Sequence, residues 1–382
     1  MNQVLFVDDE QAVLDGLENL LRRQRHVWGL HFALGATTAL SLLEAKPFDV
    51  IVTDMRMPGF DGAQLLTRVK AKWPTTVRVV LSGHADRESL ARALPVAHQF
   101  LSKPCDAGTI EGVLSRTFSL AALLKNEQLR AVVGSLDNLP SPPDLYWDLQ
   151  HVMADPSSGL DAVASLVETD PAMSLKVLQL VNSVAFGAGR PIASTKEAVR
   201  YLGVELLRAY ALSASLFSSL SAAEVQRHSL ATAHLARAFL KGSPRADEAF
   251  TAAMLQDFGK LVLRQAQPDR AKRAYASGGP TGEALVALEL ELFGATHAAV
   301  GGYLAAVWGL PLSIVEAITH HHEPGVLVGA DPLVLAAVHV AGALAQPGGG
   351  EVDLAFLRRA GLLERLSRWQ ALAAEAHQKE AA

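Results

Sequence analysis

Short hydrophobic runs alternate with amphipathic stretches in the first part of the chain, up to about residue 118. The runs end abruptly and are rich in β-branched residues, which is typical of strands buried on both faces of a parallel sheet. They cover Val4–Val7, Leu30–Leu34, Val50–Asp54, Val77–Ser82 and Gln99–Lys103, and the second is the weakest. The stretches between them carry helical periodicity. Five strands alternating with five helices predict a doubly wound α/β fold around a five-stranded parallel sheet.

The pattern changes beyond Asp144, where the strand signal ends and an Ala- and Leu-rich helical periodicity takes over. Breakers that contain Pro or Gly interrupt this periodicity repeatedly, as in GAGRP and GSPRAD. We therefore predict an all-α domain of about ten or more helices behind the α/β domain.

A proline-rich segment marks the junction between the two patterns. SLDNLPSPPD, residues 135–144, follows a helical stretch that runs from Thr117 to Arg130. We predict an α/β domain over residues 1–118, a helical linker and proline-rich junction over 119–143, an all-α domain over 144–346 and a helical tail over 347–382. After Arg368 the tail is rich in Ala and polar residues, and we expect that part to fray.

The stretch from Thr117 to Arg130 carries more apolar residues than a solvated linker needs. They are Phe118, Ala121, Leu124 and Leu129. We expect this joining helix to pack on the helical domain or on its own copy in a homodimer.

Composition narrows the class of protein. Half of the 382 residues are hydrophobic and the net charge is −5, so there is no overall basic field for nucleic acid. The first residues, MNQVLFVDDE, are acidic where a signal peptide is basic, and no uncharged apolar run reaches the roughly 18 residues of a membrane span. The single Cys105 excludes an internal disulfide framework and a Cys-rich zinc site. We expect a cytoplasmic protein with neither nucleic-acid nor membrane partners.

Polar residues stand at the ends of four of the predicted strands. They are the pair Asp8 and Asp9, then Asp54, Ser82 and Lys103. The carboxyl ends of parallel strands share one edge of the sheet, where ligands bind. Carboxylates are hard ligands for Mg²⁺, and a hydroxyl and an ammonium can hold phosphoryl oxygens. An aspartate pair alone is often a helix cap and a Lys-Pro pair alone is a turn, but all four features in this order predict a phosphoryl-transfer site.

The segments VLFVDDE, VTDMRMPGFDG, VVLSG and FLSKP closely resemble the receiver domain of two-component response regulators, which has a flavodoxin-like fold. The resemblance covers about 115 residues. It implies that Asp54 is the phosphoacceptor, with Lys103 and Ser82 holding the phosphoryl group and Ser82 and Phe100 acting as switch residues. The resemblance also implies a Mg²⁺ ion, bound by the carboxylates of Asp8, Asp9 and Asp54 and by the backbone carbonyl of Arg56. The implied phosphodonor is a sensor histidine kinase or a phosphotransfer protein.

Widely spaced histidines and an aspartate in the helical half can converge in a bundle core to bind metal. The order of His228 and Asp257 resembles the HD superfamily of metal-dependent phosphohydrolases. Gln256 stands where that family has the His of its His-Asp pair, and Gly342 stands where it has a final Asp. An amide is a poor metal ligand and Gly offers none, so we expect no metal in this domain.

Three further histidines, His297, His321 and His322, match extra ligands of the related HD-GYP group, although the GYP loop is absent. Together with His228 and Asp257 they form a possible vestigial HD site. Each also has an ordinary explanation. His228 is a polar residue of a helix, and Asp257 can bond a helix end. His297 fits the start of a helix after FGAT, and HHHEP can end a helix with its histidines near the last carbonyls.

The closest resemblance of the helical half is to the HDOD group, the non-catalytic HD-related output domains, over about Ser135–Gln346. The segments LVNS and KEAVRYLG are its most specific marks. The resemblance implies a response regulator that signals to an unknown downstream protein through protein–protein contact. The alternative is a receiver-regulated HD-type phosphohydrolase of a nucleotide or cyclic dinucleotide, against which Gln256 and Gly342 argue. A DNA-binding regulator lacks support, because no segment resembles a basic helix-turn-helix.

Overall fold

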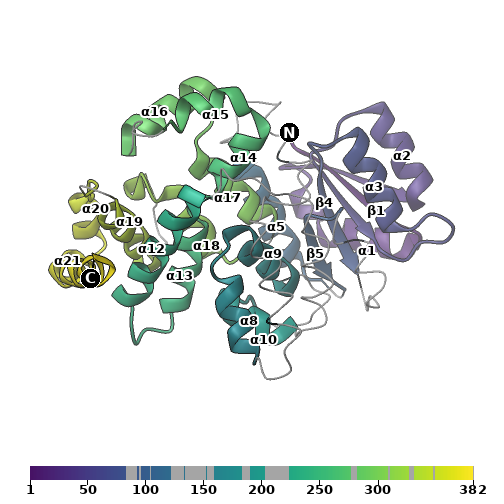
Figure 1. The fold of residues 1–382 in the computed structure, drawn as a ribbon. Helices are drawn as coiled ribbons and strands as arrows, with labels where there is room; N and C mark the ends of the chain where they lie inside the picture. The colour runs from purple at the N-terminus through teal and green to yellow at the C-terminus, as the bar shows by residue number, and fades with distance from the viewer. Residues whose placement is uncertain are drawn as a thin grey trace. The chain divides into compact units, whose positions relative to one another are not determined.

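The computed structural model describes most of the chain (Figure 1). The described residues are 1–82, 93, 96–103, 105–121, 133, 152, 159–182, 190–202, 223–276, 282–308, 310–326, 331–346 and 349–381. Leu124 and Leu129, on which the prediction of a packed joining helix depends, lie outside these ranges, as does most of the predicted junction. The side chains of Ser82 and Phe100 also lie outside the description, which covers only their backbone.

Contacts divide the chain into two compact units. The first comprises Met1–Asp137, Gln179–Arg190 and Ala306–Gly309, and the second comprises Asn138–Leu178, Pro191–Ala305 and Leu310–Ala382.

The first unit contains the parallel five-stranded sheet that the hydrophobic runs predict. Its strands are β1 (Gln3–Asp8), β2 (Gly29–Leu34), β3 (Val50–Asp54), β4 (Val77–Ser82) and β5 (Gln99–Ser102). They lie in the order β2-β1-β3-β4-β5, and every neighbouring pair is parallel. This is the doubly wound, flavodoxin-like arrangement, and it confirms the predicted fold class of the N-terminal domain. The carboxyl ends of β1, β3 and β5 therefore share one edge.

Alternate residues of each strand face opposite sides of the sheet, and both sides are buried. Leu5 and Ile51 join one core cluster with residues of α2 (Gly35–Ala45) and α3 (Gly62–Lys72). The other described helical elements of this unit are α1 (Gln11–Leu20), the 3₁₀ turn η1 (Arg22–Gln24) and α5 (Ala107–Ala121).

The start of α3 is held close to the end of β3. Asp61 and Gln64 form a reciprocal capping box, with Gln64 N donating to Asp61 Oδ1 at 2.8 Å and Asp61 N to Gln64 Oε1 at 3.1 Å. A Cβ atom on Gly62 would collide with the carbonyl oxygen of Asp54. Only glycine permits this close approach, which fixes the backbone directly after Asp54.

The second unit is helical throughout its described part, as the sequence predicts. Its helices are α8 (Leu160–Val167), α9 (Pro171–Asn182), α10 (Thr195–Leu202), α12 (Ala223–Phe239), α13 (Ala246–Leu255), α14 (Phe258–Ala266), α15 (Pro268–Ala274), α16 (Gly282–Phe293), α17 (His297–Val307), α18 (Leu312–His320), α19 (Leu333–Ala345), α20 (Leu354–Arg359) and α21 (Leu366–Ala381), with 3₁₀ turns η4 (Pro324–Val326) and η5 (Leu363–Arg365). The last residues of α9 and α17 are counted in the first unit. The centre of the second unit is formed by α12, α13, α18 and α19, which pack on one another (Figure 1). Among the described residues no single helix is long and apolar enough to cross a membrane, although α16 and α17, bent by 75°, pass by length and composition as a pair.

The C-terminal helix α21 is docked at its start, so the prediction that the chain frays after Arg368 is wrong for this part. Trp369 is 1% exposed, its ring stacks on Phe239 of α12 at 5.2 Å between centroids, and its indole N–H donates to the Phe239 carbonyl oxygen at 3.2 Å. The Ala-rich and polar composition suggested a fraying end of the chain, but one buried tryptophan anchors the helix.

Replacing Trp369 by Phe should lower the free energy of unfolding of the helical unit by about 1–2 kcal/mol. The ring contact survives in part, but the buried Phe239 carbonyl loses its donor. Urea unfolding followed by helical circular dichroism measures the effect. Arg368→Ala, at the exposed neighbouring position, is the control, and equal unfolding midpoints for both variants would mean that α21 is not anchored there.

Candidate functional site

Three predicted site residues of the first unit meet at the carboxyl edge of its sheet. The Lys103 ammonium, just after β5, lies 2.6 Å from Asp8 Oδ2 and 2.6 Å from Asp54 Oδ1. The second oxygen of Asp54 accepts a hydrogen bond from the backbone N–H of Arg56 at 2.5 Å, and Asp8 Oδ1 accepts one from Glu10 N at 3.0 Å. Parallel strand order thus brings together residues 46 and 49 positions apart in the sequence.

Because Asp8 and Asp54 are buried, their negative charges need compensation from neighbouring groups. Asp8 is 2% exposed and Asp54 is 9% exposed, so water compensates their charges poorly. Burial raises the pKa of Asp54 above its ordinary value, even though the hydrogen bond from Lys103 opposes this. For Lys103 burial disfavours the charge, but the hydrogen bonds to Asp54 and Asp8 raise its pKa. Two carboxylates share one ammonium, so a negative charge remains that attracts a hard divalent cation. The residues present therefore fit Mg²⁺.

The other predicted receiver residues are placed less fully. Asp9 is partly buried next to Asp8 and takes part in none of the bonds to Lys103. Ser82 ends β4 and pairs with Ser102, and Phe100 pairs with Val80, so the backbones of Ser82 and Phe100 lie in the neighbouring strands β4 and β5. The roles of their side chains and of the Arg56 carbonyl remain predictions.

Cys105 lies two residues after Lys103 and is partly buried. Burial and the neighbouring Asp106 raise the pKa of its thiol to about 11. Because only the thiolate reacts, alkylation at pH 8 should be roughly 100-fold slower than for a free cysteine and should accelerate up to about pH 11. Mass spectrometry after iodoacetamide treatment gives the rate, since the chain has no other cysteine.

Asp106→Asn is the matched variant for this thiol. It removes the negative charge of the carboxylate. The amide oxygen can still accept the hydrogen bond that Thr109 N donates to Asp106 Oδ1 at 2.9 Å in the unchanged chain. We expect a faster reaction than in the unchanged chain. A thiol that already reacts at pH 8 like a free cysteine would contradict the environment described for Cys105.

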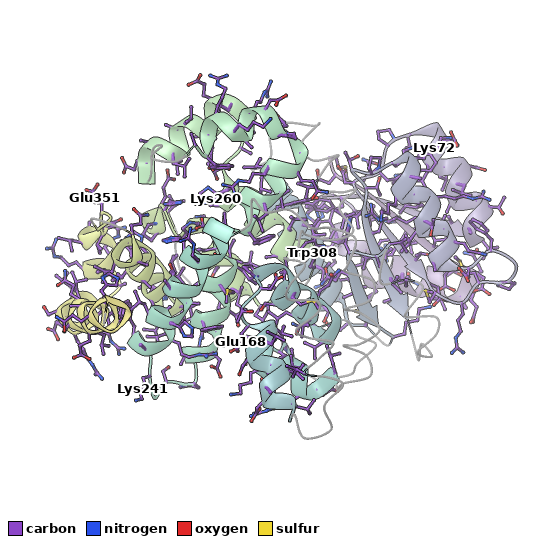
Figure 2. All side chains as sticks on the ribbon, in the orientation of Figure 1. Lys72, Glu168, Lys241, Lys260, Trp308 and Glu351 are labelled. Carbon is purple, nitrogen blue, oxygen red and sulfur yellow. The ribbon has the colours of Figure 1, made fainter. Side chains whose placement is uncertain are left out.

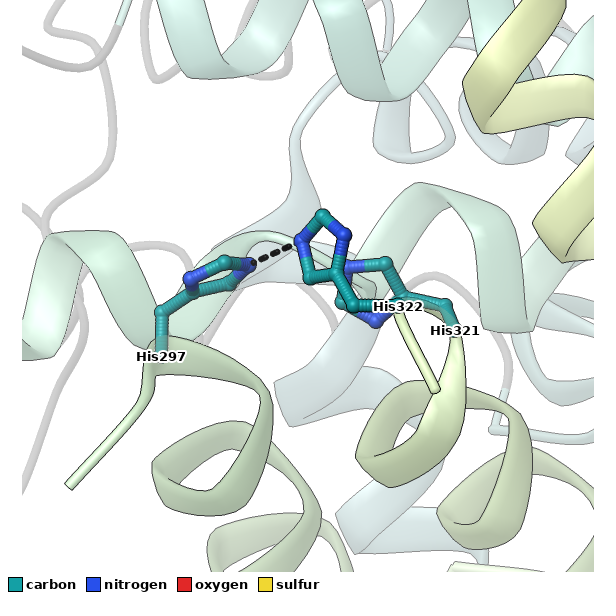
Figure 3. Close-up of side chains that lie close together, drawn as sticks. All are labelled: His297, His321 and His322. Carbon is teal, nitrogen blue, oxygen red and sulfur yellow. Dashed lines mark hydrogen bonds between the residues drawn. The ribbon is translucent and has the colours of Figure 1, made fainter. Parts of the chain in front are cut away.

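In the second unit the structure brings together all five residues of the predicted HD-like cluster. His228 lies on α12, Asp257 directly precedes α14, and His297 begins α17. His321 and His322 follow the last residue of α18 (Figure 3). Asp257 is central, with its Oδ1 3.1 Å from His297 Nε2 and its Oδ2 3.7 Å from His228 Nε2.

The three clustered histidines present ring nitrogens to one another. His297 Nε2 and His322 Nε2 are 3.2 Å apart, and the rings of His321 and His322 lie 4.1 Å apart between centroids (Figure 3). One nitrogen from each of the three lies within 4.8 Å of the others, which is a spacing that could hold a metal ion.

Two residues that orient His297 were not predicted from the sequence. The carboxylate of Glu289, completely buried, lies 2.8 Å from His297 Nδ1 and also accepts from the His297 backbone N–H at 2.9 Å. The hydroxyl of Tyr275 donates to the same carboxylate at 2.7 Å. Although burial favours a neutral ring, Glu289 and Asp257 raise the pKa of His297. A carboxylate behind a histidine is how proteins fix the ring's orientation.

Hydrogen bonds to backbone carbonyl oxygens hold His321 and its neighbour His339 in place. His321 Nδ1 lies 2.9 Å from the Ile318 carbonyl oxygen, and His339 Nδ1 lies 2.7 Å from the carbonyl oxygen of His321 itself. His339 in turn accepts from Asp353 N at 2.9 Å, which makes its Nδ1 the donor. Burial, followed by the nearby His297, lowers the pKa of His321 to about 3, and burial likewise lowers the pKa of His322.

Close packing of α14 on α17 sets the distance between Asp257 and His297. A Cβ on Gly259 would collide with the His297 carbonyl oxygen and would lie 3.0 Å from Gly301 N. The two helices can therefore cross at this distance only with glycine at position 259.

Lys260 is a further member of the cluster that was not predicted from the sequence, although it is one helical turn from Asp257. Its ammonium lies 2.8 Å from Asp257 Oδ1. Burial alone would raise the pKa of Asp257, but Lys260 and His297 hold it well below its ordinary value. The carboxylate is therefore ionised and already neutralised by a neighbouring cation.

The two positions that lack metal ligands are neighbours in space. Gln256 is 1% exposed, and a Cβ on Gly342 would lie 3.4 Å from its Oε1. The amide therefore lies beside the glycine, and its Oε1 has no hydrogen-bond partner within the described residues. Neither position supplies a negative charge.

Comparison with known families identifies both parts of the chain. The response regulator receiver domain matches residues 4–115, and the HDOD domain matches residues 139–324. The chain is therefore a response regulator by its first domain. It belongs to the proteins in which a receiver is followed by an HDOD domain, as the sequence resemblance predicts.

Individual relatives match part of the chain. The hydrogenase transcriptional regulatory protein HoxA of Cupriavidus necator is 28% identical over 54% of this chain and 44% of its own length, so the chain spans less than half of that regulator. The MmoQ response regulator of Methylococcus capsulatus is 28% identical and covers 62% of this chain and 98% of its own, with a TM-score of 0.48. A virulence factor of Campylobacter jejuni, 19% identical with a TM-score of 0.52 over 65% of this chain and 96% of its own, shares the fold alone.

Proposed function

We propose that the chain is a phosphorylation-controlled adaptor. Phosphoryl transfer to Asp54 switches the receiver, and the HDOD domain responds by binding or releasing a signalling protein through contact rather than by catalysis. The observation that carries the first step is the position of Lys103, whose ammonium lies 2.6 Å from both Asp8 and Asp54. It stands where the phosphoryl group would arrive.

The chemistry of the first step follows from these atoms. An oxygen of Asp54 attacks the phosphorus of the donor, the bond from phosphorus to the donor breaks, and an aspartyl phosphate forms. The leaving atom is the imidazole nitrogen of a phosphohistidine or the carboxylate oxygen of acetyl phosphate. The Lys103 ammonium, which is hydrogen-bonded to Asp54 Oδ1, can bond instead to a phosphoryl oxygen as negative charge develops there. Ser82 is proposed to bond to another phosphoryl oxygen. Bound Mg²⁺, held by Asp8, Asp9, Asp54 and the Arg56 carbonyl, would neutralise charge on the transferred group. The donor is a histidine kinase or another phosphodonor.

The HD-like cluster supports contact rather than hydrolysis. A metal-dependent phosphohydrolase needs a metal-activated water. Here the central carboxylate is paired with Lys260, and Gln256 and Gly342 supply no anionic ligand. We therefore favour the adaptor over a nucleotide or cyclic-dinucleotide phosphohydrolase.

Affinity capture tests this proposal. Beryllofluoride with Mg²⁺ mimics the phosphoryl group on the acceptor aspartate. The immobilised chain treated in this way should retain a different set of proteins from its source cells than the untreated chain, and Asp54→Asn should behave like the untreated chain under both conditions. An identical set with and without beryllofluoride would contradict phosphorylation-controlled binding. Hydrolysis of a nucleotide or cyclic dinucleotide by the purified chain would favour the enzyme instead.

A further inference from the structure

One face of α16 carries small and apolar residues between two glutamates. The exposed positions of this helix are Glu283, Ala284, Ala287, Leu290 and Glu291. They lie one, four, seven and eight residues after the first of them, which puts all five on a single side of an α-helix. Leu290 is 51% exposed. The face is therefore apolar between two acidic ends.

The short helix α20 has a face of the opposite charge. Leu354 is 48% exposed, and Arg358 and Arg359 follow about one turn later at exposed positions. Val326 of η4, a turn that contacts α20, is 61% exposed and adds a second apolar side chain. This face therefore offers apolar side chains and two guanidinium groups to the solvent.

The charges on these two faces lack ion-pair partners. None of Glu283, Glu291 and Arg358 forms an ion pair with another described residue. Exposed pairs do form elsewhere in the same unit where opposite charges adjoin, as between Lys272 and Asp269 at 3.2 Å. Figure 1 shows α16 and α20 at the margin of this unit. Both faces are open to another molecule.

The two faces also match in spacing. Ala287 lies four residues from each glutamate of the α16 face, and Arg358 lies four residues after Leu354. Four residues of a helix advance about 6 Å along its axis. With Leu354 seated on the small side chain of Ala287, Arg358 therefore reaches a glutamate whether the two helices run parallel or antiparallel. An arginine and a carboxylate can then form two parallel hydrogen bonds.

A second copy of the chain satisfies both faces at once. In a two-fold dimer each contact occurs twice, so α16 of one protomer meets α20 of its partner and the reverse. Contacts between like faces are disfavoured, because two α16 helices would bring glutamates together and two α20 helices would bring arginines together. Residues 354–368 hold four arginines and no lysine, and arginine is enriched and lysine depleted in protein interfaces.

A membrane or a nucleic acid fits these faces less well. The apolar side of α20 carries Phe356 and Leu357, which are already buried in the domain, so this helix cannot insert them between lipids. The acidic ends of the α16 face would repel phosphate groups. The two faces together therefore favour a protein partner that carries both charges.

We propose that the chain forms a two-fold homodimer in which α16 of each protomer packs on α20 of the other. This interface involves neither the joining helix nor Asp54, so the unphosphorylated chain dimerises through it. The inference goes beyond the proposed function. Its failure would leave phosphorylation-controlled binding untouched, because the capture experiment does not measure the dimer.

Sedimentation equilibrium of the full chain without a phosphodonor measures the dissociation constant of the dimer. One pair of charges is reversed in Arg358→Glu with Arg359→Glu, and the other in Glu283→Arg with Glu291→Arg. Each reversal should weaken the dimer at least about 100-fold, because like charges then meet at both contacts. All four changes in one chain restore opposite charges and should restore the dimer. Circular dichroism verifies that each variant is folded.

Two further variants separate charge from position. Arg200→Glu is the matched control, because Arg200 is an exposed arginine of α10 that lies 2.7 Å from Asp161 and outside both faces. It should leave the dissociation constant unchanged. Leu354→Ser tests the apolar part and should weaken the dimer roughly tenfold or more, since a leucine in each contact loses its burial. If a double reversal does not fold, Arg358→Glu and Glu291→Arg alone are measured with the same expected direction.

Three results would overturn the proposal. One is a monomer at every concentration of the unchanged chain. Another is a dimer that survives either reversal with an unaltered dissociation constant, because the interface would then lie elsewhere, as on the joining helix. The third is a loss of the dimer in both reversals that the combined variant does not restore, because α16 and α20 would then not face each other.

Discussion

Asp54→Asn should abolish phosphoryl labelling of the chain by acetyl phosphate or by its kinase. An amide is a far weaker nucleophile than the carboxylate that ends β3, and it also removes one negative charge from the pair that Lys103 bridges. Labelling is measured by phosphate-affinity electrophoresis and by mass spectrometry of the modified peptide.

Asp49→Asn is the matched control, because Asp49 directly precedes the same strand at its opposite end. Its Oδ2 accepts a hydrogen bond from Gln3 N at 2.6 Å, and an asparagine oxygen can accept the same bond. This variant should be labelled normally. Labelling that persists in Asp54→Asn would assign the phosphoacceptor to another residue.

Lys103→Met should slow phosphoryl labelling by about 10²–10³-fold, the usual cost of removing one positioned group that stabilises developing charge. The variant leaves Asp8 and Asp54 without the ammonium that lies 2.6 Å from each. The rate with acetyl phosphate at saturating Mg²⁺ measures the effect, and circular dichroism verifies that the variant is folded.

Lys72→Met serves as the control for Lys103. Lys72 pairs with Glu44 on the surface of the receiver, with a side chain that is 58% exposed, and lies at the outer edge of that domain (Figure 2). Its replacement should leave the labelling rate unchanged. An unaltered rate in Lys103→Met would remove Lys103 from the phosphoryl-transfer site.

The receiver was predictable because its signals are local and its topology is restrictive. Hydrophobic runs define the strands, and parallel order then forces Asp8, Asp54 and Lys103 to one edge. The sequence alone could not show how they bond, nor that Cys105 sits in surroundings that suppress its thiolate.

The helical cluster was predictable only in part. Resemblance indicated Asp257 and His297, but their partners Glu289 and Lys260 depend on how α14, α16 and α17 pack. Glu289 stands in a stretch of Leu and Glu, two strong helix formers, so it looked like a residue of an ordinary helix. Lys260 has the three-residue spacing of a common surface pair, and only its burial distinguishes it from Lys272. The prediction that the C-terminal tail frays was wrong for the same reason, since composition does not reveal that Trp369 is buried.

The central claim is that phosphorylation of Asp54 alters the HDOD domain of the same chain. Hydrogen–deuterium exchange of the full chain, with and without beryllofluoride and Mg²⁺, tests it most directly. The account predicts altered exchange in peptides of the receiver and also in peptides of the helical unit, with both changes absent from Asp54→Asn. Changes confined to the receiver peptides would contradict it.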